Sequence, residues 1–247
     1  MKAHQVEYEI VGDGIQLVEI ELEPYETIIA EAGAMIYMED GIEYKVKMGD
    51  GSDPTQGFIR KLFSARSRLI TGESIFLTYF TNRALSKKRV SFAAPYPGTI
   101  IPLNLRETSR NLIVQKEGFL CAAYGTKITV HLNKRLVSSL FGGEDFVLQK
   151  ITGDGKVFLH AGGTIVEKFL ENDTLRVDTG CVVAFESSID FDIEQSGGLK
   201  SMIFGGEGIF LASLRGTGKV WLQSMPVRKF IQAISPRGKN VSKGVGT

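Results

Sequence analysis

Three glutamates occupy the same position in three similar sequence segments, and this repetition makes them candidates for a functional site. Glu73, Glu144 and Glu207 each follow a glycine and precede a short apolar run that ends in leucine. If the three segments are related by symmetry, their carboxylates would ring a common axis. The alternative, which we favour, is that each glutamate caps a turn or lies exposed before a strand. Repeated segments also repeat the residues that their turns require, so repetition alone does not indicate a site.

A cluster of cations lies in the segment from Phe58 to Arg68, and it is the second candidate site. Its members are Arg60, Lys61, Arg66 and Arg68, with Phe58, Ile59, Leu62 and Phe63 between and before them. A basic amphipathic segment of this kind can lie on an anionic membrane or meet RNA. The alternative is a short helix that packs its apolar side on a sheet and leaves its charges in solvent. Segments 136–141 and 199–204 have the same apolar spacing without the basic excess, which favours this alternative.

Two glycine-rich fragments resemble parts of a phosphate loop. They are Gly153-Asp154-Gly155-Lys156 and Gly216-Thr217-Gly218-Lys219. A phosphate loop leads into a helix, whereas each lysine here leads into a strand-like apolar run. We therefore predict hairpin turns at both places and a further hairpin at Gly12-Asp13-Gly14, which separates two alternating runs.

The remaining reactive residue types form no recognisable motif. His4, His131 and His160 are scattered, without the spacing of metal ligands. No Gly-x-Ser-x-Gly elbow is present either. We assign no catalytic, cofactor-binding or metal-binding residue and expect no cofactor.

Internal repetition shows how these segments are positioned. Phe141–Glu144 recurs as Phe204–Glu207, 63 residues later, and Gly153–Leu159 recurs at the same offset as Gly216–Leu222. A fainter copy begins at Gly72–Leu77. Upstream of these segments, each copy reads as a strand, a glycine and a second strand, and the three stretches are 27–36, 112–121 and 174–183. The glycine is expected to supply a turn or bulge.

The repetition predicts an all-β fold of three tandem β-sandwich-like repeats about a pseudo-threefold axis, with short helical turns and a C-terminal helix. One unit of about 65 residues is marginal alone, whereas three units side by side share a core and limit exposed edges. The predicted boundaries are 1–98 for the first repeat with an insertion at about 49–68, 99–160 for the second, 161–226 for the third, and 227–247 for the helix and tail.

Composition restricts the function classes. The net charge is +1 across 247 residues, so the basic excess typical of nucleic-acid-binding proteins is absent. The N-terminus lacks the pattern of a signal peptide and no apolar run approaches the ~20 residues of a membrane span, which predicts a cytoplasmic protein. Cys121 and Cys181 each lie in an apolar run, which favours two buried free thiols.

Four segments together resemble a known family. Thr27–Met35, Gly72–Leu77, Phe204–Leu211 and Lys219–Pro226 are similar to the family named after the yeast mitochondrial-inheritance protein Aim24, whose prokaryotic members are mostly of unknown function. The resemblance implies a fold like that of the tryptophan RNA-binding attenuation protein and a link to inner-membrane organisation among the mitochondrial relatives. The family has no assigned catalytic residue that could be transferred to this sequence, and no motif here matches the tryptophan or RNA sites of the attenuation protein. A shared fold does not carry function.

These observations leave three function classes open. The leading hypothesis is a non-enzymatic scaffold or binding protein that acts through its surface, with an unknown protein partner and with self-association as a further expectation. The second is an RNA- or small-ligand-binding module, by analogy of fold. The third is an uncharacterised enzyme. A contiguous Lys/Arg strip with exposed aromatic residues would favour the second class.

The basic segment predicts weak, salt-sensitive binding to anionic liposomes. Each cation near an anionic surface contributes about 1 kcal/mol, and salt screens the attraction beyond ~8 Å. Replacing Arg60, Lys61, Arg66 and Arg68 by serine should abolish co-flotation with such liposomes and leave the protein folded. Wild-type protein that ignores anionic liposomes at low salt would contradict the prediction.

Overall fold

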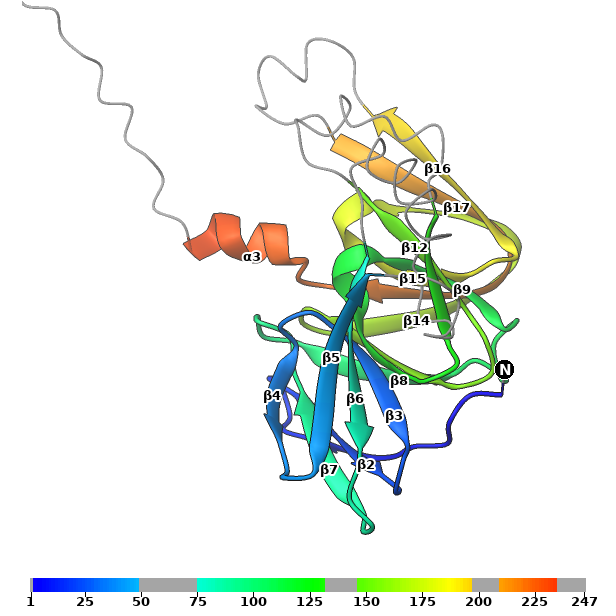
Figure 1. Cartoon of the computed structure of the whole chain (residues 1–247). Coiled ribbons are helices and arrows are strands. Elements are labelled where there is room, and N and C mark those ends of the chain that lie inside the picture. The colour runs from blue at the N-terminus through cyan, green and yellow to red at the C-terminus, as the bar shows by residue number, and fades with distance from the viewer. Residues whose placement is uncertain (1, 49–74, 132–145, 197–208, 235–247) are drawn as a thin grey trace, which may run out of the picture.

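The computed structural model describes residues 2–48, 75–131, 146–196 and 209–234 (Figure 1). Within these ranges the chain is almost entirely β, and the strands pair antiparallel in three sheets. The α-helix there is α3 (Val227–Ile234), and 3₁₀ turns occupy Lys116–Gly118 and Thr179–Cys181. The all-β class and the C-terminal helix are therefore confirmed. No helix in the described part of the chain is long and apolar enough to cross a membrane.

Seventeen strands build the described sheets. The first sheet has the order β1 (Glu7–Val11), β2 (Leu17–Leu22), β7 (Lys88–Phe92), β4 (Met35–Met38). The second has the order β5 (Ile42–Met48), β6 (Phe76–Asn82), β3 (Thr27–Glu31), β10 (Phe119–Ala123), β13 (Lys156–Ala161), β8 (Thr99–Asn104). The third has the order β11 (Lys127–His131), β12 (Leu148–Thr152), β9 (Asn111–Gln115), β15 (Val182–Glu186), β17 (Ile209–Gln223), β14 (Ile165–Asp178), and β16 (Ile189–Ser196) also pairs with β17.

The predicted strand–glycine–strand segments are present at all three places. They are β3 and β4, β9 and β10, and the end of β14 followed by β15. Gly33, between β3 and β4, has a φ of 87°, a left-handed conformation that glycine adopts without steric cost. The two strands of each segment do not pair with one another. β3 and β4 belong to different sheets, as do β9 and β10, whereas β14 and β15 both pair with β17.

Two of the three predicted hairpins are wrong. Gly12–Gly14 does join the paired strands β1 and β2. Gly153–Gly155 instead carries the chain from β12 in the third sheet to β13 in the second. Gly216–Gly218 lies inside the continuous strand β17, which pairs with β14 on both sides of these glycines. In both places glycine allows the chain to bend, and the segments on its two sides do not pair with each other.

The same pairing scheme occurs in three successive stretches of chain. β6 pairs with β3 and β5, β12 pairs with β9 and β11, and the first half of β17 pairs with the second half of β14 and with β16. Consecutive stretches are joined by β10 against β3 and by β15 against β9. The described strands do not pair β4 with β14, so these pairs do not close a ring. The division into three repeats about a pseudo-threefold axis stays a prediction.

The apolar core follows the junctions between the sheets. One cluster fills the space between the first and second sheets and includes Phe80 and Phe92, whose ring centroids are 5.2 Å apart. A second cluster, with Trp221, joins strands of the second and third sheets, and a third lies within the third sheet. Cys121 is buried in the first cluster, but Cys181 is only partly buried, so the prediction of two buried thiols holds for Cys121 alone. Both cysteines are free thiols.

Candidate functional site

The sites expected from the sequence lie outside the described residues. This applies to Glu73, Glu144 and Glu207, to Arg60, Lys61, Arg66 and Arg68, and to the three segments expected to form short helical turns. A different charged site is present within the described residues, on the first sheet.

Carboxylates face one another across strands β1 and β2. Glu7 lies opposite Glu21, and Glu9 lies opposite Glu19. Like charges directly opposite each other destabilise a strand pair, so this arrangement needs compensating cations. The neighbouring strand β7 supplies them, because it places Arg89 directly opposite Glu21 on the other side of β2.

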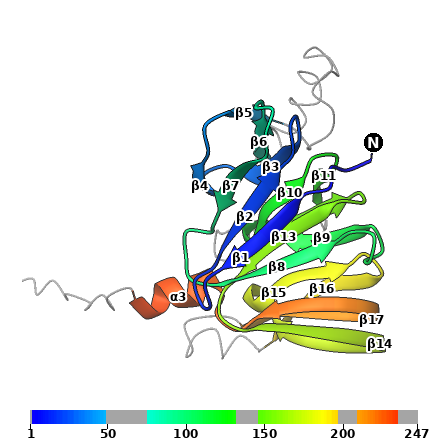
Figure 2. The same cartoon turned by 90° about the horizontal axis from the view of Figure 1, so that it is seen from below.

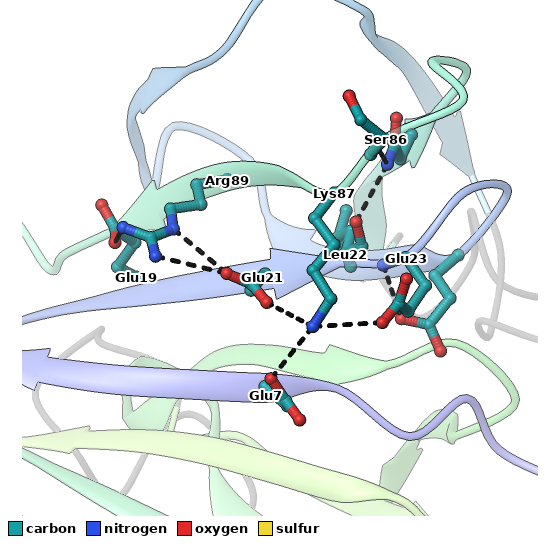
Figure 3. Close-up of polar contacts among 10 residues, drawn as sticks. Glu7, Glu19, Glu21, Leu22, Glu23, Ser86, Lys87 and Arg89 are labelled. Carbon is teal, nitrogen blue, oxygen red and sulfur yellow. Dashed lines mark hydrogen bonds and ion pairs between the residues drawn. The ribbon is translucent and has the colours of Figure 1, made fainter.

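Two cations bridge Glu7, Glu19, Glu21 and the nearby Glu23, as Figure 3 shows. Lys87 Nζ lies 2.7 Å from Glu21 Oε1, 3.1 Å from Glu23 Oε1 and 3.4 Å from Glu7 Oε2. The Arg89 guanidinium lies 3.1 Å from Glu19 Oε1 and 3.2 Å from Glu21 Oε2. We call these residues the charged cluster: Glu7, Glu19, Glu21, Glu23, Lys87 and Arg89.

The ion pairs keep the charges of the cluster fixed. The Lys87 hydrogen bond holds the pKa of Glu21 below its usual 4.5, and Arg89 acts in the same direction. In return, hydrogen bonds to glutamate raise the pKa of both Lys87 and Arg89. The shifts move each of these groups further from neutrality, so all three stay ionised at physiological pH.

A buried asparagine positions Lys87. The Asn82 amide nitrogen donates to the carbonyl of Leu22, at 2.9 Å, and to that of Ser86, at 2.8 Å. Its side-chain oxygen accepts the N–H of Ala84 at 2.9 Å. These bonds tie the turn between β6 and β7 to the end of β2, and Lys87 directly follows that turn.

A cavity of about 410 Å³ opens beside the charged cluster. Its lining includes five carboxylates and three cations, namely Glu7, Glu21, Glu23, Glu26, Asp154, Lys87, Arg106 and Lys156. The N-terminal segment forms one wall with residues 4–7. We call it the acidic cavity.

The cations of the acidic cavity all have partners. Lys87 is held in the charged cluster, and Arg106 lies 3.4 Å from Asp154. Lys156 donates to the carbonyl of Val6 at 3.1 Å and lies 4.6 Å over the ring of Tyr8. The cavity therefore presents a surplus of negative charge.

Asp154 also joins two distant parts of the chain. Its carboxylate accepts the backbone N–H of Ala3 at 2.8 Å, and this bond lowers the pKa of Asp154. Ala3 itself is buried, so the N-terminal segment is held against the bend at Gly153–Gly155. The wall of the cavity thus depends on a contact across most of the sequence.

A second cavity of about 460 Å³ has the opposite charge balance. It is lined by His4, Tyr25, Thr27, Glu43, Lys45, Lys47, Tyr79, Thr81, Arg83 and Tyr124. Lys45 and Arg83 both pair with Glu43, each at 2.9 Å. This shared carboxylate offsets part of the positive charge. His4 borders both cavities, and its Nδ1 accepts the N–H of Thr27 at 3.0 Å.

Groups whose pKa shifts favour the uncharged form lie elsewhere. Burial raises the pKa of Glu31 to about 7, and Lys116 opposes that rise. Burial lowers the pKa of His160 to about 4, and the Tyr96 ring packs edge-on against it at 4.6 Å. His160 is only 2% exposed, which keeps its imidazole away from a solute. Across the described residues, no group of three His, Cys, Asp or Glu side chains is placed to hold a metal ion.

Comparison with known proteins identifies the family. The family described as mitochondrial biogenesis AIM24 matches residues 8–225. This chain belongs to the AIM24 family. An uncharacterised protein of Streptococcus pyogenes serotype M6, M6_Spy0233, is 29% identical over 217 residues, which are 87% of this chain and 83% of that protein.

A solved structure supports the fold. The crystal structure of SPYM3_0169 from Streptococcus pyogenes superposes with a TM-score of 0.71 at 23% identity, covering 93% of this chain and 98% of that one. The AIM24 resemblance seen in the sequence is thereby confirmed, whereas the likeness to the tryptophan RNA-binding attenuation protein stays a prediction.

The charged cluster predicts a pH-dependent effect of Lys87→Met. Near pH 7 the variant leaves Glu7, Glu21 and Glu23 without their shared cation, so its urea unfolding midpoint should fall below that of wild type. A carboxylate with a lowered pKa contributes stability above its unfolded pKa and loses it as the pH falls through the folded value. The difference between variant and wild type should therefore shrink at about pH 3.

Lys45→Met is the matched control for this experiment. It removes one exposed cation whose carboxylate, Glu43, keeps Arg83 as a partner. This control should change the midpoint little at either pH. An equal loss for Lys87→Met at both pH values would show that packing, and not charge, explains the effect.

Proposed function

We propose that this AIM24-family protein is a non-enzymatic binding protein that acts through its surface, and that the acidic cavity receives a lysine- or arginine-bearing segment of a partner protein. The surplus of carboxylates over cations in the lining carries this proposal. Because each cation there already has a partner within the chain, the surplus is available to an external cation.

The electrostatics favour binding over proton transfer at this place. A general acid or base works best with a pKa near the operating pH. Glu21 and Asp154 are shifted the other way, to lower pKa values. Groups of this kind hold a constant charge, which suits recognition of an ionic partner.

The expected affinity is modest and depends on salt. Glu7 and Glu23 are more than half exposed in their side chains, at 78% and 55%. Exposed ion pairs contribute about 0.2–1 kcal/mol each and are screened by salt. Several such pairs within one cavity of fixed shape are needed for specific binding.

An anionic ligand at the second cavity is the other candidate, and it corresponds to the RNA- or small-ligand-binding class. Its support is the combination of lysine and arginine with the exposed Tyr25. We favour the acidic cavity because Glu43 engages two of the three cations of the second one. Attachment to a membrane through Arg60, Lys61, Arg66 and Arg68 remains a separate expectation, since those residues lie outside the described chain.

A fluorescent hexalysine peptide tests the proposal. Fluorescence anisotropy should detect binding at low salt and a progressive loss as salt is added. The double variant Glu23→Gln with Glu26→Gln should weaken binding by roughly two- to thirtyfold, because two of the carboxylates that line the cavity become neutral. After Glu26→Gln, the amide oxygen at this position can still accept the backbone N–H of Glu23 in the turn.

The matched control is Glu9→Gln with Glu39→Gln. These glutamates are exposed and do not line the cavity, yet the change in net charge is the same. Binding by the control should equal that of wild type. An equal loss in both double variants would indicate general attraction to an acidic surface, and no binding at low salt would refute the proposal.

A further inference from the structure

Two edge strands, one in the first sheet and one in the third, are paired on one side only among the described strands. One is β4, the last strand of the first sheet, which pairs with β7 alone. The other is the second half of β14, residues 174–178, which pairs with β17 alone. In Figure 2, β4 and β14 lie at opposite ends of the molecule.

β4 corresponds to two other strands, β10 and β15, which are paired on both sides. β4, β10 and β15 each pair with a returning strand, namely β7, β13 and the second half of β17. The register of each pair shifts at the same point: between Met35 and Tyr37, between Phe119 and Cys121, and between Val182 and Ala184. On their other sides β10 and β15 pair with β3 and β9, and β4 has no such neighbour among the described strands.

The second half of β14 corresponds to β3 and β9 in the same way. It pairs with β17 as β3 pairs with β6 and as β9 pairs with β12. The open sides of β3 and β9 are occupied by β10 and β15. Within the chain, β3 pairs with β10 and β9 pairs with β15. The second half of β14 corresponds to β3 and β9, and β4 corresponds to β10 and β15, but these two have no such partner among the described strands.

The two edge strands are more exposed to solvent than the corresponding strands that are paired on both sides. All of β10 and the first four residues of β15 are buried. At the corresponding strand β4, Met35, Ile36 and Tyr37 are 38%, 55% and 42% exposed. On β14, Arg176 is exposed and its neighbours Leu175 and Val177 are only partly buried, whereas residues 28–30 and 112–114 are buried. An apolar, unpaired edge strand is a template for pairing with another chain.

We propose that β4 of one chain pairs antiparallel with the second half of β14 in a second copy of this chain. The internal joints fix the register. Cys121 lies opposite Ala30, and Ala184 lies opposite Val114. The equivalent intermolecular pair is Tyr37 opposite Val177, followed by Met38 opposite Arg176.

Backbone geometry agrees with this register. The N–H of Glu39 donates to the carbonyl of Arg89 on β7 at 3.0 Å. Because alternate residues of a strand direct their N–H and C=O groups to opposite sides, Met38 directs its own groups away from β7. The backbone of Arg176 from the second copy meets them there. The joint unites β16, β17 and β14 of one copy with β4, β7, β2 and β1 of the other in one sheet.

The contact is heterologous, because it joins two different edges. Each chain carries one edge of each kind, so the contact repeats from copy to copy and gives a closed ring or an open chain. Wild-type protein should therefore have a mass in light scattering of at least twice the 27.1 kDa of one chain. The proposal is independent of the ligand of the acidic cavity.

Disulfide trapping tests the register. In a Cys181→Ser background, chains with Tyr37→Cys are mixed with chains with Val177→Cys and oxidised. Directly opposite residues place their Cα atoms about 4.5–5.5 Å apart, within the range of a disulfide, so a covalent dimer should form. The control mixes Tyr37→Cys with Arg176→Cys, whose side chain points to the opposite face of the strand, and should give little product.

A charge at the edge tests the assembly itself. Tyr37→Lys places a cation opposite the apolar Val177 and should yield monomers with an unchanged circular dichroism spectrum. Tyr44→Lys, a similarly exposed tyrosine on β5, should keep the wild-type mass. Monomeric wild-type protein at tens of micromolar would overturn the proposal. So would a disulfide between two Tyr37→Cys chains as readily as in the mixture, or equal trapping with Arg176→Cys.

Discussion

The pairing of β10 with β3 and of β15 with β9 holds the described chain together. Through these two joints, strands that are far apart in the sequence complete one another's sheets. The second sheet takes β5, β6 and β3 from the first part of the chain and β10, β13 and β8 from the next. Residues 28–30 are buried where β10 covers the edge of β3, so the core of the first part depends on the second part.

The charged cluster depends on the same strand order. Glu7 and Glu21 face each other because β1 pairs with β2. This is tolerable because β7 places Arg89 on the other side of β2, and Lys87, the residue before β7, bridges the two carboxylates. The bond between Ala3 and Asp154 then holds the N-terminal segment at the bend between β12 and β13. The acidic cavity forms between these parts, so its charge balance is set by segments that lie far apart in the sequence.

Local patterns in the sequence predict the local structure well. The strands on either side of Gly33 and the helix α3 form where alternation and helical spacing place them. The glycines at 153–155 and 216–218 show the limit of such patterns. Glycine indicates that the chain bends, but whether the flanking strands pair with each other depends on partners such as β8 and β10, which the local sequence does not contain.

The candidate site shows the same limit. Glutamates at every second position from Glu19 to Glu23 signal a charged face of a strand, and this signal is visible in the sequence. The cations opposite them are set by the pairing of β7 with β2, and Asp154 reaches the cavity through a contact across 151 residues. Long-range pairing of this kind has no local signature.

Shared sheets make the described chain one cooperative unit, and unfolding monitored by two probes tests this cooperativity most directly. Trp221 is the single tryptophan of the sequence, and it is buried on β17, where its indole N–H donates to Glu167 at 2.9 Å. Its fluorescence reports on the last part of the chain, and far-UV circular dichroism reports on all the strands. Coincident urea transitions are the criterion for a single cooperative unit, and we expect them here. A fluorescence transition clearly separated from the circular dichroism transition would contradict the account.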